Sequence, residues 1–471
     1  MTLDELLELE GNDLIKAVRD TKTDTKYEEG IKQYDVNKHD VKSLVHRPNK
    51  LKLVPDTDKP LNADGTPQVK KESTEVAKIA IPLQKYIINQ RASFAVGNKI
   101  TFKSDVPDSP VFDAAWTTWR KSKMQYILKE IAVKLMSETE VALIWYATQD
   151  AKSPGNLKFR NKVVSPSTGD ALYPVFDKYN DMIAFGRGYK IDDKDEYFDL
   201  YTKDELRRFK TNERGEFEEQ FKEVDDEGNG VVERLQYGKI PVIYWRQDKP
   251  ECDDVKDLIR AREFNQSDFF DNNQYYGDPM LFLKGTSINM PAKGAAGKVL
   301  EGSEDADAKF LTPGDYTAAR KLEFDMLDQM IFLLSNAANL SPEALKGMGD
   351  ALSGAGMDRM LIGPHMAARD MQDGEFGRGI QRCMNFLLAV YSDILSINDG
   401  VEAEPVFSLF RIDDLRERIE IAQLANGGKP ILDQEGSIEL AGFDYPDEIM
   451  NRIKADTPAP VSPTNPIEEP E

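Results

Sequence analysis

The segment PAKGAAGKVLEG, residues 291–302, comes nearest to a nucleotide-binding loop in this sequence. A phosphate-binding loop needs G-x-x-x-x-G-K followed by Ser or Thr, so that a hydroxyl group can hold magnesium. Here Gly294 and Gly297 are too close together, and Val299 stands where the hydroxyl is required. The segment therefore predicts a flexible loop and no nucleotide site.

Histidines, cysteines and carboxylates are the usual metal ligands and acid–base groups, and their spacing here indicates no site. The three histidines lack ligand spacing with one another, with either cysteine and with any acid cluster; these residues are His39, His46, His365, Cys252 and Cys383. With 83 acidic residues, no pair stands out as a general acid and base. DDEGNG, residues 225–230, lacks the ligand order of a calcium loop and predicts a hairpin turn. We predict no metal, no cofactor and no enzymatic activity.

Lys346 lies in a glycine-rich connection, LSPEALKGMGDALSGAGMDRML, between two apolar-rich helical stretches at residues 340–361. Four glycines and a proline predict flexibility there. One lysine on a loop is ordinarily just solvated. If many copies of the loop converged on one axis, a ring of lysines could contact DNA phosphates without reading base sequence.

Composition bounds the class of protein. The chain has 471 residues, 40% of them hydrophobic, and a formal net charge of −22. That length predicts several structural units, and the acidity disfavours nucleic-acid binding by the surface as a whole. The sequence contains no run of about twenty apolar residues, so it predicts no membrane span. The acidic N-terminus differs from a secretory signal. The two widely spaced cysteines fit a reducing compartment. A basic island at 38–53, with Lys70 and Lys71, is interpreted as solvated surface of an N-terminal arm.

The hydrophobic pattern predicts an α+β fold. Short aromatic and β-branched strands follow one another between residues 139 and 247 without intervening helices. Ahead of them we expect amphipathic helices within 3–35, a polar loop from Pro48 to Val69, and helical spacing from Ile79 to Val96. A short strand, KITFKS, and a helix over 110–137 complete this part.

The second half reads as a helical stalk with a tip. A helix beginning near Val255, after Asp253 and Asp254, reaches Tyr276, an insert covers 278–316, and a returning helix covers 318–337 with apolar residues on more than one face. Residues 353–397 predict a helix kinked at Gly363-Pro364. A strand, EPVFSLF, and helices at 412–426 and 432–452 follow, and the proline-rich end predicts disorder.

Several of these stretches, in this order, resemble the portal proteins of tailed bacteriophages, in the subgroup typical of long-tailed phages. The similar stretches are KIAIPLQKYIINQRASFAVGNKI (78–100), KIPVIYWRQDKPECDDVKDLIRAREFNQSDFFDNNQYYGDPMLFLKG (239–285) and LSGAGMDRML (352–361). The resemblance extends over about residues 20–452. One departure is that Gly363-Pro364 and the glycines at 374, 377 and 379 make the long helix unusually breakable.

The resemblance implies a portal-type fold with wing, helical stem, small α/β clip and α-helical crown, assembled as a ring of about twelve subunits. The implied parts are the outer wing at 1–253, stem helices at 254–276 and 318–337, a clip at 277–317, a tunnel loop at 338–352, a long kinked wing helix at 353–397, a crown at 398–452 and a disordered tail at 453–471.

The resemblance also implies a function. The ring would be the channel at one capsid vertex of the virion, assembled in the bacterial cytoplasm, through which double-stranded DNA is packaged and ejected. Implied partners are the terminase large subunit, the major capsid and scaffolding proteins and a head–tail adaptor, with no membrane. An acidic oligomeric scaffold or adaptor without DNA contact is the alternative.

Position within that scheme selects the candidate site residues. For the DNA channel they are Lys346, Gly347, Met348 and Gly349 at the loop apex, with Arg320 and Lys321 at the base of the second stem helix. For motor or adaptor docking they are Lys293, Lys298 and Lys309 in the clip.

Overall fold

The computed structural model describes residues 2–456, except 57, 63–64, 66, 107, 151–152, 193–194, 222, 225–229, 277–279, 285–286, 290–300, 303–306, 312–316, 343–360, 409–414, 428–430 and 444–445. The chain divides into two compact units. The first comprises residues 1–347 and 360–410, and the second comprises 348–359 and 411–471.

Helices and strands that are distant in sequence share the main core of the first unit. Its largest hydrophobic cluster joins residues of α4, α5, α6 and α12 to the strands β4 and β14, with Trp119, Trp145, Trp245 and Phe386 nearly inaccessible. The helices are α4 (Leu83–Val96), α5 (Pro110–Lys121), α6 (Met124–Glu138), α11 (Ile362–Asp373) and α12 (Glu375–Leu395). Burial of these large side chains is the main force that holds the unit together.

Antiparallel sheets also belong to this unit and confirm the predicted α+β class. A three-stranded sheet has the order β14-β4-β5, and a six-stranded sheet has the order β10-β9-β8-β7-β6 with β13 paired to β9. The strands are β4 (Glu140–Asp150), β5 (Ser153–Val164), β6 (Ala171–Phe176), β7 (Met182–Lys190), β8 (Glu196–Tyr201), β9 (Glu205–Thr211), β10 (Phe217–Glu219), β13 (Glu233–Arg234) and β14 (Val242–Arg246). The short β11 (Glu223–Val224) pairs with β12 (Gly230–Val231).

The helices α1 (Leu3–Leu7) and α2 (Gly11–Asp20), in the region predicted to form amphipathic helices, cover the larger sheet. Leu6, Leu14 and Val18 are buried against Phe198 and Phe209 of that sheet. The next helix, α3 (Tyr27–Tyr34), packs on α6 and is followed by the 3-10 turns η1 (Val36–Lys38) and η2 (Asp40–Lys42).

Two sequence-based predictions between residues 48 and 82 are wrong. The predicted polar loop contains a hairpin, β1 (Lys50–Pro55) paired with β2 (Val69–Thr74). The helix predicted from Ile79 begins only at Leu83, and residues 75–82 have no helical structure. Pro82 explains the later start, because proline disfavours the helical conformation of the residue before it.

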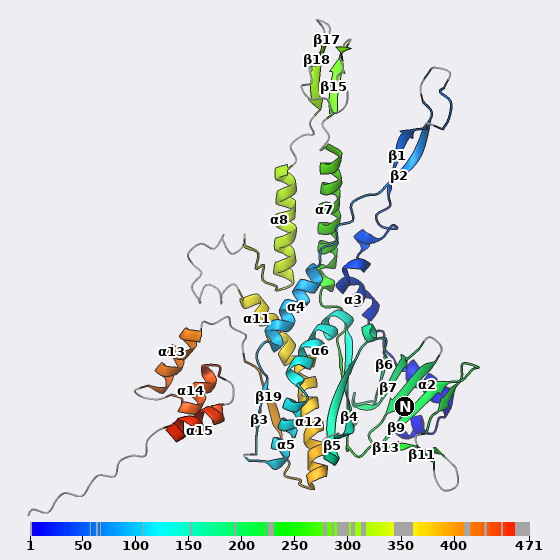
Figure 1. Cartoon of the computed structure of the whole chain (residues 1–471). Helices are drawn as coiled ribbons and strands as arrows, with labels where there is room; N and C mark the ends of the chain where they lie inside the picture. Colours follow the sequence, from blue (N-terminus) through cyan, green and yellow to red (C-terminus); the bar gives the residue numbers. More distant parts are fainter. Residues whose placement is uncertain are drawn as a thin grey trace, which may run out of the picture. The chain divides into compact units, whose positions relative to one another are not determined.

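The predicted stalk is confirmed as two helices that lie side by side (Figure 1). The turn η4 (Asp253–Val255) leads into α7 (Lys256–Tyr276), and α8 (Thr317–Leu334) returns along it. Between them in the chain, β15 (Met280–Lys284) pairs with β18 (Asp307–Leu311) and β16 (Ser287–Asn289) pairs with β17 (Glu301–Gly302).

Gly363 and Pro364, where a kink was predicted, lie in the first turn of α11, and residues 343–360 before them lie outside the described residues. A break occurs at Gly374, one of the glycines that made the predicted long helix breakable, which has extended backbone between α11 and α12. Gly379 lies within α12, where the helix approaches β14 so closely that a Cβ atom would overlap the Trp245 indole. This glycine therefore permits close packing and does not break the helix.

The predicted strands KITFKS and EPVFSLF pair with each other. They form β3 (Thr101–Ser104) and β19 (Ala403–Val406), an antiparallel ladder in the first unit. The second unit contains α13 (Leu415–Asn426), α14 (Gln434–Leu440) and α15 (Pro446–Asp456). The first two lie within the ranges predicted as helices, whereas α15 extends beyond the predicted end at residue 452 into the range predicted as disordered.

Candidate functional site

The facing sides of α7 and α8 are joined by aromatic and polar contacts. Phe269 and Phe324 meet edge to face with ring centroids 5.8 Å apart. Arg262 donates from Nε to Asp328 Oδ1 over 3.0 Å, and its guanidinium lies 4.2 Å from the centroid of the Phe324 ring. Asn265 Nδ2 donates to Glu323 Oε1 over 2.7 Å. These contacts fix the two helices side by side.

A second face of α8 presents large apolar side chains to solvent. Met326 is two residues from both Phe324 and Asp328, so it points about 200° around the helix from the α7 contact. The exposed residues, which we call the α8 stripe, are Leu322, Met326, Met330, Leu333 and Leu334. Leu333 is 76% exposed and Leu322 62%. A continuous apolar row of this kind marks an interaction surface.

An extended segment lies along the opposite side of α7. We call residues 77–81 the strap. The backbone N–H groups of Ala77, Ile79 and Ile81 donate to side chains of α7, over 2.8 Å to Asp271 Oδ1, 3.0 Å to Ser267 Oγ and 2.7 Å to Glu263 Oε1, respectively.

The two periodicities explain this ladder. Every second strand residue advances about 6.6–6.8 Å, and every fourth helix residue advances about 6 Å. Alternate strap amides therefore meet acceptors at positions 263, 267 and 271 in turn.

Arg47 locks the strap to the same helix. It donates from Nε to the Ala77 carbonyl oxygen over 2.6 Å, and from Nη1 and Nη2 to Asp268 Oδ1 and Asp271 Oδ2, each over 2.9 Å. The Arg47 side chain is nearly buried. Its planar guanidinium suits this arrangement because it donates in fixed directions.

His39 pairs with Glu263 at the Ile81 end of the strap. The pKa of His39 is raised above its ordinary value: burial alone lowers it, but the hydrogen bond and charge of Glu263 and the bond to the Gln33 carbonyl outweigh burial. The sequence-based search missed the strap, His39 and Arg47. The only local signal was the i, i+4, i+8 row of acceptors on α7, which is also typical of a solvated helix face.

The predicted channel residues divide into two groups. Arg320 and Lys321 lie in the first turns of α8, where Arg320 Nη1 is 3.3 Å from Glu323 Oε2 and Lys321 is exposed. The other four, Lys346, Gly347, Met348 and Gly349, lie outside the described residues.

The predicted docking residues are described only at one position. Lys309 is in β18, opposite Phe282 of β15. Lys293 and Lys298 lie outside the described residues.

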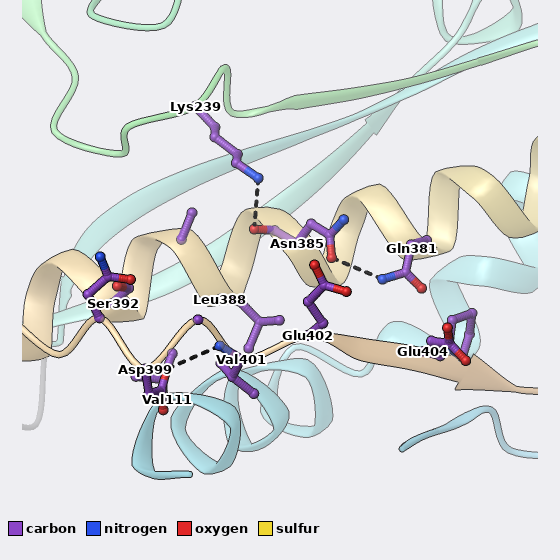
Figure 2. A pocket seen from close by; sticks show the side chains of 14 residues that line it. Val111, Lys239, Gln381, Asn385, Leu388, Ser392, Asp399, Val401, Glu402 and Glu404 are labelled. Carbon is purple, nitrogen blue, oxygen red and sulfur yellow. Dashed lines mark hydrogen bonds between the residues drawn. The ribbon is translucent and has the colours of Figure 1, made fainter. Parts of the chain in front are cut away.

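A polar groove of about 710 Å³ lies beside α12 and β19. Figure 2 shows Gln381, Asn385 and Ser392 of α12 along one wall, with Glu402 and Glu404 from the segment at β19 opposite. Asp399 accepts from Ser109 Oγ and from the Val401 N–H, so its carboxylate closes a turn. The described lining includes no histidine or cysteine, and the groove has negative charge but no nucleophile–base pair.

The remaining kinds of site concern all the residues that the structure describes. No group of three or more His, Cys, Asp or Glu side chains among them could hold a metal ion. No described helix has both the length and the apolar character needed to cross a bilayer.

Comparison with known families identifies the class as a phage structural protein. Residues 16–458 match the family model described as phage portal protein, SPP1 Gp6-like. The protein belongs to this phage portal protein family, which confirms the resemblance seen in the sequence.

Solved structures give a weaker similarity. One is a chain from the neck of an empty GTA particle computed with C6 symmetry, and another is from the neck of a native GTA particle computed with C12 symmetry. Each is 11% identical to this chain with a TM-score of 0.38, covering 76% of this chain and 88% or 89% of the other, respectively. No curated protein matches the chain significantly.

Proposed function

We propose that this portal-family protein assembles as a ring of about twelve copies at one capsid vertex, and that double-stranded DNA enters and leaves the head through the ring. The observation that carries this proposal is the α8 stripe on a helix whose other side already packs on α7. Within the described part of one chain, this row of large apolar side chains remains exposed to water.

Assembly gives those side chains a partner. Complete burial of a leucine or methionine side chain contributes about 1.5–3 kcal/mol relative to exposure. Each interface in a closed ring would bury one stripe, so every copy gains this contribution. A heterologous contact repeated around an axis closes into a ring when its rotation allows.

The charge of the chain suits a conduit. At −22, most of the surface repels phosphate, so DNA passes without being trapped, while a few basic residues steady it. Energy for packaging would come from the partner ATPase, the terminase large subunit. The capsid, scaffolding and head–tail adaptor proteins are the other proposed partners.

The proposed parts follow the chain. The wing is 1–253 with the long helix region 353–397, the stem is 254–276 and 318–337, the clip is 277–317, the tunnel loop is 338–352 and the crown is 398–452. Lys321, exposed on α8, is the better-supported channel residue of the two on that helix, since the charge of Arg320 is paired with Glu323. Lys346, Gly347, Met348 and Gly349 would form the loop apex, and Lys293, Lys298 and Lys309 the docking surface.

Assembly is tested with Met326→Asp combined with Met330→Asp. The two charges fall in the middle of the α8 stripe, so the variant is expected to remain monomeric while the unchanged protein forms rings with an axial hole. Mass photometry counts the copies, and negative-stain microscopy detects the hole.

Tyr179→Asp is the matched control, because Tyr179 is 74% exposed at the β6–β7 turn, away from α8 in the fold. It should assemble normally. Rings formed equally well by the double variant would exclude the α8 stripe as the interface, and a compact dimer or tetramer without a channel would favour the scaffold alternative.

Passage of DNA is tested separately in the tunnel loop. Gly347→Pro with Gly349→Pro should stiffen the loop and block DNA packaging while rings still form. Gly347→Ala with Gly349→Ala is the control, because alanine keeps the backbone N–H. Normal filling of heads by the proline variant would contradict the role given to this loop.

A further inference from the structure

The β1–β2 hairpin has an exposed apolar face that no other described residue of the chain covers. Leu51 and Leu53 of β1 are 67% and 62% exposed, and Val69 of β2 is 59% exposed. The register pairs Leu51 with Ser73, Leu53 with Lys71 and Pro55 with Val69, so these side chains share one face. Alternation places Lys50, Lys52 and Lys70 on the other face. An isolated two-stranded hairpin is marginal in water and gains stability when a face is covered.

The base of the hairpin is fixed to the side of α7 away from α8. Lys50 Nζ lies 3.6 Å from Asp271 Oδ2, and the chain beyond β2 continues directly into the strap. Ser267, which receives the strap, is two residues from both Asn265 and Phe269, which contact α8. Two residues correspond to about 200° around a helix, so strap and α8 occupy opposite sides of α7.

The α8 stripe therefore faces away from the hairpin of the same chain. The order across this part of the first unit is hairpin base and strap, α7, α8, and then the α8 stripe. Two different apolar surfaces thus lie on opposite sides of one body. This is the arrangement that head-to-tail association requires, since a heterologous interface joins two unlike patches.

We propose that the apolar face of the β1–β2 hairpin packs on the α8 stripe of a second copy of this chain. The inference rests on the proposed ring and specifies which element of the neighbour covers the stripe.

Dimensions and charge support this occupant. Leu51 and Leu53 are two strand residues apart, about 6.6–6.8 Å, and Met326 and Met330 are four helix residues apart, about 6 Å. This is the same match of periods that seats the strap on α7. Lys71 lies on the apolar face of the hairpin, and the exposed Asp325 lies beside Leu322 and Met326 on α8. Lys71 of one copy would pair with Asp325 of the next.

Cysteine cross-linking of the full chain tests the contact. Leu53→Cys is combined with Met326→Cys, and mild oxidant or a short bis-maleimide is added. The two native cysteines, Cys252 and Cys383, are buried, and burial raises the pKa of Cys252 to about 12, so both should stay unreactive. The expected result is a ladder of covalent multimers on a denaturing gel.

The control keeps Met326→Cys but uses Lys52→Cys, on the opposite face of the hairpin, in place of Leu53→Cys. It should give at least tenfold fewer covalent multimers. A cross-link confined to one chain, seen as a monomer of altered mobility, overturns the proposal. Rings by mass photometry without a ladder overturn it while leaving the proposed portal function standing. A chain that forms neither rings nor cross-links overturns both.

A charge exchange provides a second measurement that requires no new disulfide. Lys71→Asp should lower the ring fraction at low salt severalfold, and adding Asp325→Lys should restore it. Failure of the second change to restore assembly, when the first impairs it, contradicts the pairing.

Discussion

His39 Nδ1 lies 2.7 Å from Glu263 Oε1, and both side chains are at most 4% exposed. His39 Nε2 is 2.9 Å from the Gln33 carbonyl oxygen. Because both partners are acceptors, the imidazole makes both bonds only when both nitrogens carry protons. Glu263 Oε1 also accepts from the Ile81 N–H. One buried carboxylate thus joins the N-terminal region, the strap and α7.

This pairing predicts a pH dependence of stability. Since the pKa of His39 is raised in the folded state, its contribution is complete below the ordinary histidine pKa and is lost as pH rises through the folded value. The melting temperature should therefore fall with rising pH above about 6.5. In His39→Ala this part of the pH dependence should disappear, with a loss of about 3–5 kcal/mol at pH 6 for breaking a buried pair.

His46→Ala is the control, because His46 is much more exposed and lies 3.4 Å from Asp40. It should change the unfolding free energy by well under 1 kcal/mol. Thermal melts of both variants between pH 6 and 9 measure how the melting temperature depends on pH in each. An unchanged slope of melting temperature against pH in His39→Ala would assign the dependence to another group.

The row of hydrogen bonds from the strap amides to α7 predicts that proline at neighbouring strap positions lowers stability unequally. Ala77→Pro removes the N–H that donates to Asp271, and a hydrogen bond to a charged group contributes about 1.5–3 kcal/mol. Ala80→Pro changes a residue whose N–H has no hydrogen-bond partner in the described part of the chain, and it should cost far less. Denaturant unfolding measures both. Equal losses of unfolding free energy in the two variants would mean that the hydrogen bond from the Ala77 N–H contributes little to stability.

Close packing of α12 on β14 predicts a further asymmetry. Gly379→Ala would push a methyl group into the Trp245 indole, whose Nε1 donates to the Phe376 carbonyl oxygen over 3.1 Å. Overpacking of this kind costs about 1–3 kcal/mol, and tryptophan fluorescence should shift with it. In Gly188→Ala, by contrast, the nearest atoms are 3.6 Å or more away, so stability should be nearly unchanged. A tolerated Gly379→Ala would show that the helix can move away from the sheet.

Local sequence patterns predicted most of the helices and strands, whereas contacts between residues distant in sequence could not be predicted. The alternating strands and the two-sided apolar pattern of α8 were visible because the residues that form each pattern are neighbours in sequence. The strap was not visible, since Ile81 and Glu263 are separated by 182 residues and neither carries a signal of the other. Gly379 was interpreted as a helix breaker because a glycine required for close approach looks the same in sequence until its neighbour is known.

Arg47 predicts how firmly the hairpin is held in place. Lysine at this position has one nitrogen and cannot reach the Ala77 carbonyl, Asp268 and Asp271 together, as the guanidinium does. Arg47→Lys should therefore keep the positive charge yet leave a nearly buried acceptor unsatisfied, at a cost of about 1–3 kcal/mol. The loss should be local. Amide hydrogen exchange at the strap positions Ala77, Ile79 and Ile81 should accelerate at least tenfold, because these amides exchange when the strap leaves α7.

The matched change is Lys50→Arg, which retains a cation beside Asp271 at an exposed position. Exchange at the strap should then stay as in the unchanged protein. If Arg47→Lys also leaves exchange unchanged, the acceptors on α7 hold the strap without the guanidinium. In that case the hairpin base would be fixed mainly by the bonds from the strap amides to Glu263, Ser267 and Asp271.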